Sequence, residues 1–173
     1  MMTRKINKTR YAILGMLLDK PKSGYEIKKI MSCSTNYFWK ESDASIYPML
    51  KILAREEKVV AESLAVNRRR KEVFSITNSG RQEFEIWMKK ATEPDTLRSE
   101  FLLKLFFTLD KKRMEELFAE MLPKLEERMK IYGTIKERLE GLDFPGKEFR
   151  MRTLENGMAH TELEIQFLKG GLC

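Results

Sequence analysis

The sequence predicts a mainly α-helical chain with one small two-stranded β-element, divided into two domains. Apolar residues recur at three- and four-residue spacing over most of the 173 residues. Strand-like alternation is confined to residues 59–77. The helical pattern breaks at the segment TEPDT, residues 92–96. We therefore expect one domain at residues 1–92 and a second, all-helical domain at residues 93–173.

Charge is distributed unevenly between these two domains. Residues 1–92 contain 19 Lys and Arg against 10 Asp and Glu, whereas residues 93–173 contain 14 against 16. The formal charge is therefore +9 in the first domain and −2 in the second. This asymmetry is typical of a polyanion-binding module joined to a neutral module with a different task.

The composition argues against several other classes of protein. Cys33, Cys173 and the single histidine, His160, cannot form a disulfide framework or a metal cluster, and the sequence has no glycine-rich phosphate loop. No apolar run approaches the roughly 18 residues of a membrane span, and the basic start lacks a signal-peptide cleavage site. We therefore expect a cytoplasmic protein that is not an enzyme, with no metal, no cofactor and no membrane partner.

Two short helices are predicted at the start of the first domain. Residues 11–19 carry apolar side chains at helical spacing and are followed by Pro21, a stop signal. Ser23 precedes Glu26 by three residues, so its hydroxyl and the carboxylate can each satisfy a free amide at a helix start. The second helix should begin there.

The third predicted helix has two different faces. Proline is tolerated within the first turn of a helix, so Pro48 places the helix start near Ala44 or Ser45. An apolar stripe on one face consists of Ile46, Leu50 and Leu53. The opposite face is small, hydroxylated and basic, and consists of Ala44, Tyr47, Pro48, Lys51 and Arg55. Such a face is suited to approach a partner.

A hairpin with a basic tip follows the third helix. Residues 59–66 and 72–77 are rich in Val, Ile and Phe, and residues 67–71 join them. The tip contains four adjacent cations, which repel one another until phosphates displace their counterions: Arg68, Arg69, Arg70 and Lys71. Three helices and a hairpin, in this order, form a winged helix-turn-helix domain, in which the third helix enters a DNA major groove. A merely solvated basic turn is the alternative.

The second domain is predicted to form a homodimer. Its last helix, about residues 147–168, has a coiled-coil seam at 3,4,3,4,3 spacing, which consists of Met151, Leu154, Met158, Thr161, Ile165 and Leu168. Phe106 lies in a segment that is apolar on nearly every side. Packing within one chain is the alternative. A two-fold dimer would present two third helices to a pseudo-palindromic operator with half-sites about 10 bp apart or a multiple of that.

The sequence also resembles a known family, the PadR-type transcriptional regulators. The segments LGMLLDKPKSGYEIKK, FWKESDASIYPMLKILAREEKV and RRRKEVFSITNSG look like its winged-helix signature, and SEFLLKLFF and FRMRTLENGMAHTELEIQFL are similar to its helical C-terminal domain. The resemblance implies a homodimeric repressor that leaves double-stranded DNA when a small-molecule effector or another signal alters the dimer. It also implies DNA contacts from Tyr25, Ser45, Tyr47, Pro48 and Lys51, and a wing formed by Arg68 to Lys71.

Two departures from the family pattern bear on the docking. The family usually has a glycine after the recognition helix, whereas this chain has REEKV. Glu56 and Glu57 would repel DNA there unless they turn inward or pair with Arg55 or Lys58. Phe74 stands where a tyrosine is common, so a hydroxyl contact is absent.

Three aromatic residues are candidates for an effector pocket: Trp39, Trp87 and Phe107. Apolar pockets bind flat molecules, although core packing is the alternative for each side chain. Two other functions compete with operator binding. One is a winged-helix adaptor that binds an acidic protein partner, and the other is a ligand-binding protein that does not bind DNA.

Overall fold

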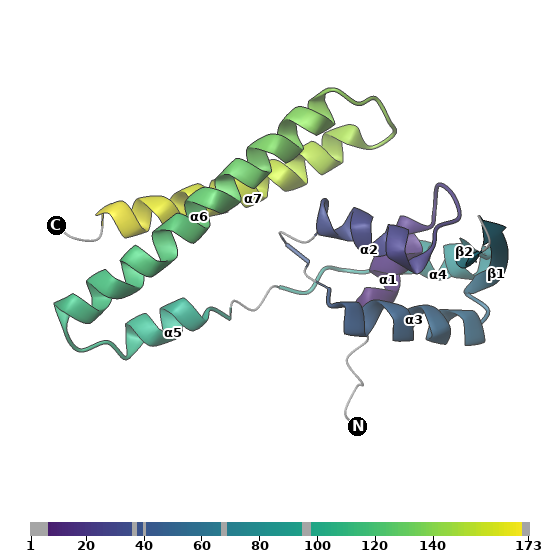
Figure 1. The fold of residues 1–173 in the computed structure, drawn as a ribbon, viewed down its shortest axis with the longest axis horizontal. Helices are drawn as coiled ribbons and strands as arrows, with labels where there is room; N and C mark the ends of the chain where they lie inside the picture. The colour runs from purple at the N-terminus through teal and green to yellow at the C-terminus, as the bar shows by residue number, and fades with distance from the viewer. Residues whose placement is uncertain (1–6, 36–37, 40, 67–68, 95–97, 171–173) are drawn as a thin grey trace. The chain divides into compact units, whose positions relative to one another are not determined.

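The computed structural model describes residues 7–35, 38–39, 41–66, 69–94 and 98–170. The chain forms two compact units, residues 1–93 and 94–173. The first unit contains α1 (Thr9–Met16), α2 (Gly24–Ser32), α3 (Asp43–Arg55), β1 (Val59–Val66), β2 (Arg69–Ile76) and α4 (Asn78–Met88). The second contains α5 (Glu100–Phe106), α6 (Lys111–Glu140) and α7 (Lys147–Gly170) (Figure 1). The fold is therefore mostly helical, with one two-stranded antiparallel sheet.

The core of the first unit confirms the apolar stripes predicted from the sequence. α1, α2 and α3 pack around side chains that are almost completely buried. β1 and β2 close this core at one end through Val59 and Phe74. The helical members of the core are Ile13, Leu14, Leu17, Ile27, Ile46, Leu50 and Leu53.

α1 runs from Thr9 to Met16, whereas the sequence predicted a helix over residues 11–19. The observed helix is therefore shifted toward the N-terminus. Lys22 explains the early end. Its ammonium group donates to the carbonyl of Met16 at 2.7 Å and forms an ion pair with Asp19. The backbone of Lys22 also forms a β-bridge with Phe74, with N–O distances of 3.0 and 2.9 Å. Lys22 is only 5% exposed, and these contacts satisfy its buried charge.

α3 begins at Asp43, slightly earlier than predicted, and Pro48 is its sixth residue. Pro48 therefore lies beyond the first turn, and the sequence-based placement of the helix start is wrong by one or two residues. The helix tolerates the proline because only the bond to the carbonyl of Ala44 is missing, near a helix end whose groups face solvent.

The wing differs from the predicted hairpin in the length of its second strand. β1 and β2 pair antiparallel from Val59 opposite Ile76 to Val66 opposite Arg69. Arg69, Arg70 and Lys71 are therefore strand residues and not part of a five-residue tip as predicted. Continued backbone pairing outweighs the charge repulsion that favoured a turn. Arg68 lies outside the described residues, as do the side chains of Arg69 and Arg70.

The second unit is built on the long helices α6 and α7, which pack side by side (Figure 1). α5 packs against α6, with the rings of Phe101 and Phe118 6.0 Å apart. The core of this unit consists of Leu117, Phe118, Leu125, Ile165 and Leu168. Among the described residues, no helix is both long and apolar enough to cross a membrane.

The predicted intermolecular seam is largely used within the chain. Leu154, Thr161, Ile165 and Leu168 are buried in a single copy of the protein. Their assignment to a dimer interface is therefore wrong, and packing within the chain, the alternative interpretation, is correct for these four. A 3,4 repeat marks an apolar stripe but does not say which helix covers it. Met151 and Met158 are only half-buried.

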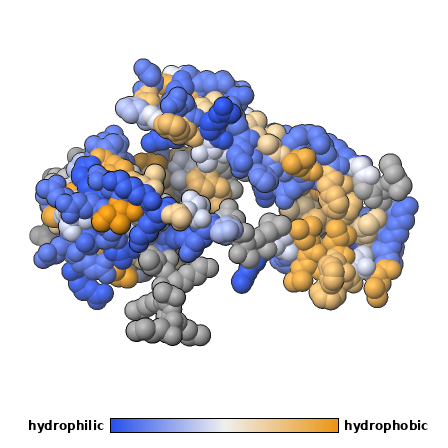
Figure 2. All heavy atoms as spheres, turned by 180° about the vertical axis from the view of Figure 1, so that it is seen from behind, coloured by the Kyte–Doolittle hydropathy of each residue, from blue (hydrophilic) through white to orange (hydrophobic). Residues whose placement is uncertain are grey.

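Other apolar side chains of the second unit remain uncovered. Phe106 is 80% exposed, and Figure 2 shows hydrophobic side chains gathered over α5, at the lower right of that view. Leu163, on α7, is 64% exposed. The further exposed apolar residues of α5 to α7 and their connections are Leu102, Leu103, Phe107, Leu109, Ile131, Leu142, Phe149 and Phe167.

Candidate nucleic-acid interface

The outer face of α3 carries the residue types predicted from the sequence. Tyr47, Pro48 and Lys51 are exposed, while Ile46 and Leu50 on the opposite side are buried. The helix therefore presents a hydroxyl, a rigid ring and a cation to solvent on one side. That combination can contact phosphates and base edges in a groove.

Ser45 differs from its neighbours on α3 because its hydroxyl already has partners within the protein. Its Oγ lies 2.8 Å from Oε2 of Glu41 and 2.7 Å from the carbonyl oxygen of Ser42, so it can donate to either. Oε1 of Glu41 accepts hydrogen bonds from Thr9 Oγ1 at 2.7 Å and from Trp39 Nε1 at 2.6 Å. Glu41 thus fixes the start of α3 to α1 and to the preceding loop. No periodicity or motif points to Glu41, since it lies in that loop.

The start of α2 lies beside the wing and contains the predicted capping box. The Ser23 hydroxyl accepts from the amide of Glu26, and the Glu26 carboxylate accepts from the Ser23 amide at 2.8 Å. The other carboxylate oxygen of Glu26 lies 3.0 Å from Lys71 Nζ on β2. Hydrogen bonds from the Ser23 backbone and hydroxyl, together with Lys71, lower the pKa of Glu26 from 4.5 to about 2. Tyr25, the residue before Glu26, is 65% exposed.

Gly24 allows α2 and α3 to approach closely at this surface. A Cβ atom added to Gly24 would lie 2.6 Å from Cε1 of Tyr47 and 3.3 Å from a methyl group of Leu50. Only a residue without a side chain leaves room for the Tyr47 ring there. Gly24 therefore sets the position of a predicted DNA-contacting side chain. The sequence-based site did not include it.

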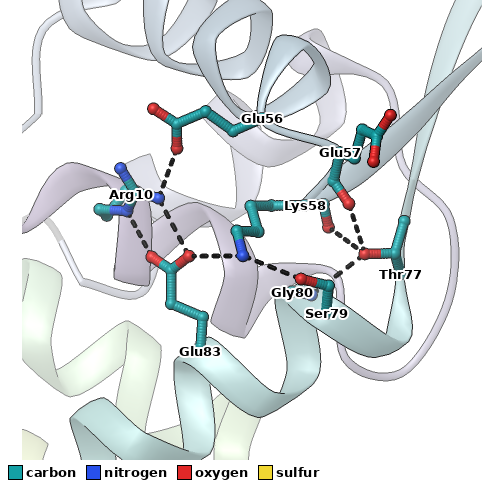
Figure 3. A network of polar contacts seen from close by, with 8 residues as sticks. All are labelled: Arg10, Glu56, Glu57, Lys58, Thr77, Ser79, Gly80 and Glu83. Atoms are coloured by element: carbon teal, nitrogen blue, oxygen red, sulfur yellow. Dashed lines mark hydrogen bonds and ion pairs between the residues drawn. The ribbon is translucent and has the colours of Figure 1, made fainter.

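A polar network holds the other end of α3 (Figure 3). Arg10 on α1 donates to Oε1 of Glu83 at 2.6 Å and to Oε2 of Glu56 at 2.7 Å. Lys58 lies 3.5 Å from the Glu83 carboxylate and donates to Ser79 Oγ at 2.8 Å. The network joins α1, the C-terminal end of α3, the start of the wing and α4. Glu56 thus stays exposed but is paired, and its partner is Arg10 and not Arg55 or Lys58, the two partners suggested by the sequence.

Comparison with known proteins places this arrangement in a family. The model of the transcriptional regulator PadR-like family matches residues 13–86, and the model described as virulence activator alpha C-term matches residues 97–170. The negative transcriptional regulator PadR of Bacillus subtilis is 28% identical over 148 residues, which cover 81% of this chain and 81% of that protein. Residues 13–86 belong to the PadR-like family of transcriptional regulators.

Solved structures of PadR from B. subtilis share the fold over nearly the whole chain. The complex with operator DNA has a TM-score of 0.83 at 26% identity and covers 95% of this chain and 96% of that chain. The complex with p-coumaric acid has a TM-score of 0.76 at 25% identity and the same coverage. The likeness to PadR therefore extends over both units.

The departure from the PadR-like pattern after α3 has a structural cost. Glu57 has a φ of 55°, the left-handed conformation that glycine adopts most readily. The amide of Glu57 donates to the carbonyl of Ala54, and the amide of Lys58 donates to that of Leu53. This is the Schellman pattern that usually ends with glycine. The Thr77 hydroxyl lies 2.8 Å from the carbonyl oxygen of Glu57 and helps to hold it in place.

The three aromatic residues predicted to form an effector pocket lie in different surroundings in this PadR-like chain. Trp87 stacks on Tyr11 with ring centroids 4.6 Å apart and lines a surface hollow of about 280 Å³ in the first unit. Phe107 lines a different hollow, of about 570 Å³, in the second unit. Trp39 is engaged by Glu41. Within either unit, the structure does not bring the three together.

Proposed function

We propose that this chain is a dimeric regulator that binds a DNA operator through α3, the start of α2 and the wing. The PadR-like family supplies the class of function, since its members are transcriptional regulators. B. subtilis PadR, similar over both units, has been crystallised with operator DNA. The observation that carries the proposal is the exposed face of α3 with Tyr47, Pro48 and Lys51, opposite the buried stripe.

In this proposal α3 occupies the major groove, and the wing reaches the adjacent backbone or minor groove. Lys51 and the wing residues Arg68, Arg69 and Arg70 neutralise phosphates, while Tyr25 and Tyr47 contact the DNA from neighbouring elements. The Ser45 hydroxyl has a smaller role, because Glu41 and the Ser42 carbonyl already engage it.

Replacement of Lys51 tests the docking face. A gel shift would use DNA from upstream of the protein's own coding sequence. Lys51→Ala should bind roughly tenfold more weakly, because a phosphate-facing cation is removed. Lys90→Ala, an exposed lysine after α4, removes the same charge elsewhere and should leave binding unchanged. Equal losses in both variants would mean that net charge matters and not the α3 face.

We propose that the second unit dimerises through its exposed apolar side chains, among them Phe106 and Leu163. Isolated small domains rarely leave so many large apolar side chains in water, and a second copy would cover them. A two-fold dimer then aligns two α3 helices with a pseudo-palindromic operator.

We propose repression that is released by a small molecule. B. subtilis PadR is described as a negative regulator and has a structure with p-coumaric acid. That compound is therefore the first probe for this chain. It should weaken operator binding in a gel shift and alter the fluorescence of Trp39 or Trp87. Operator binding and fluorescence that both stay constant during the titration would contradict this part of the proposal.

The proposed activity is DNA binding, which requires no catalytic step, and we place it in the cytoplasm. The described residues include no group of three or more His, Cys, Asp or Glu that could hold a metal ion.

A further inference from the structure

Glu26 and Lys71 bring opposite charges together between α2 and the wing. Lys71 Nζ lies 3.0 Å from Oε1 of Glu26, and the side chains of Lys71 and Glu26 remain 42% and 44% exposed, respectively. Tyr25 beside them is exposed on the surface proposed to meet DNA. Under the proposed function, an approaching duplex meets this ion pair and not a free lysine.

The carboxylate of Glu26 cannot easily turn away from that surface. Its Oε2 accepts hydrogen bonds from the amide of Ser23 at 2.8 Å and from the hydroxyl of Ser23 at 2.7 Å. These bonds hold the negative charge at the start of α2. A phosphate that recruits Lys71 must break the ion pair and then lie near a fixed negative charge. Both requirements oppose DNA binding.

We propose that Glu26 is an affinity-determining residue that weakens DNA binding by holding Lys71 away from the phosphates. The inference rests on the proposed function, because it concerns the same surface. Phosphate contacts carry no base information, so the effect should be the same for operator and random DNA. Glu26 would thus limit how tightly the regulator holds any duplex.

Glu26→Gln separates the charge from the helix cap. Glutamine can form the same capping box as glutamate, while Lys71 is left without its ionic partner. This variant should bind both operator and random duplexes roughly three- to tenfold more tightly at low salt. The slope of log affinity against log salt should steepen by about one unit, because one more phosphate is neutralised. The ratio of operator to random affinity should not change.

Three control variants identify why Glu26→Gln should bind DNA more tightly. Glu85→Gln makes the same change in net charge on the exposed surface of α4 and should not alter binding. Ser23→Ala weakens the cap but keeps the Glu26 charge, and should bind no more tightly than the wild type. Glu26→Gln combined with Lys71→Ala should return to the wild-type salt slope, because the pair as a whole has no net charge.

A second variant keeps the test valid if Glu26→Gln folds poorly by circular dichroism. Glu26→Ala also removes the charge and should show the same gain. If the wild type binds DNA but neither variant binds more tightly, this inference is wrong and the proposed function stands. A gain confined to operator DNA would also overturn it, since Glu26 would then contact a base. If the wild type binds no duplex, the proposed function itself fails.

Discussion

Glu57 occupies a backbone conformation that a residue with a Cβ atom disfavours. Its φ of 55° completes the Schellman pattern at the end of α3. The same two backbone hydrogen bonds would form with glycine and without the steric cost. The protein thus gives up some stability directly behind the helix proposed to contact DNA.

Glu57→Gly should stabilise the first unit by about 0.5–1 kcal/mol, because the steric cost of the left-handed conformation exceeds the extra chain entropy of glycine. Urea unfolding measures this change. Glu57→Ala removes the same charge but keeps a Cβ atom, so it should give no comparable gain. Equal stabilisation by both variants would attribute the effect to charge and not to backbone strain.

At the level of the helices and strands, periodicity predicted the buried faces better than the ends. The stripe of Ile46, Leu50 and Leu53 and the Ser23–Glu26 capping box are both present. The ends of α1 and β2 depended on specific contacts that periodicity does not reveal. Lys22 ends α1 through a buried ammonium group, and pairing with β1 draws Arg69 to Lys71 into β2.

The capping box of α2 should make stability depend on pH. The folded protein lowers the pKa of Glu26 from 4.5 to about 2, so its stabilisation is fully present above pH 4.5 and disappears as the pH falls toward 2. The ionised Glu26 carboxylate should stabilise the folded protein by less than about 1 kcal/mol, since its side chain is 44% exposed and water screens the charge. Thermal melts should show that Glu26→Gln is less stable than the wild type at pH 7 and that this difference in stability becomes smaller below pH 4.5. A difference in stability that stays constant down to pH 2 would show that the Glu26 carboxylate is not the source of the pH dependence.

At the level of the whole molecule, the sequence predicted two units, but four of the side chains that it assigned to the dimer interface are buried within one chain. The seam of α7 has the right spacing, yet α6 of the same chain covers Leu154, Thr161 and Ile165. Sequence spacing alone does not tell whether α6 of the same chain or a helix of a second copy covers this stripe, because either would bury the same side chains. The side chains left for a second copy include Phe106 and Leu163.

Lysine substitutions should separate the two apolar surfaces of the second unit. Phe106→Lys combined with Leu163→Lys should give folded monomers by light scattering, because charges then replace apolar contacts between copies. Ile165→Lys should instead unfold the unit, since it buries an unpaired charge. A double variant that remains dimeric would place the interface elsewhere.

The central claim is that α3 and the wing together contact DNA phosphates. A salt titration of operator binding tests it most directly, with the wild type compared to the combined Arg68→Ala, Arg69→Ala and Arg70→Ala variant. We predict that the slope of log affinity against log salt becomes shallower by about 0.9 for each phosphate that the variant no longer neutralises. Weaker or equal binding with an unchanged slope would contradict the claim.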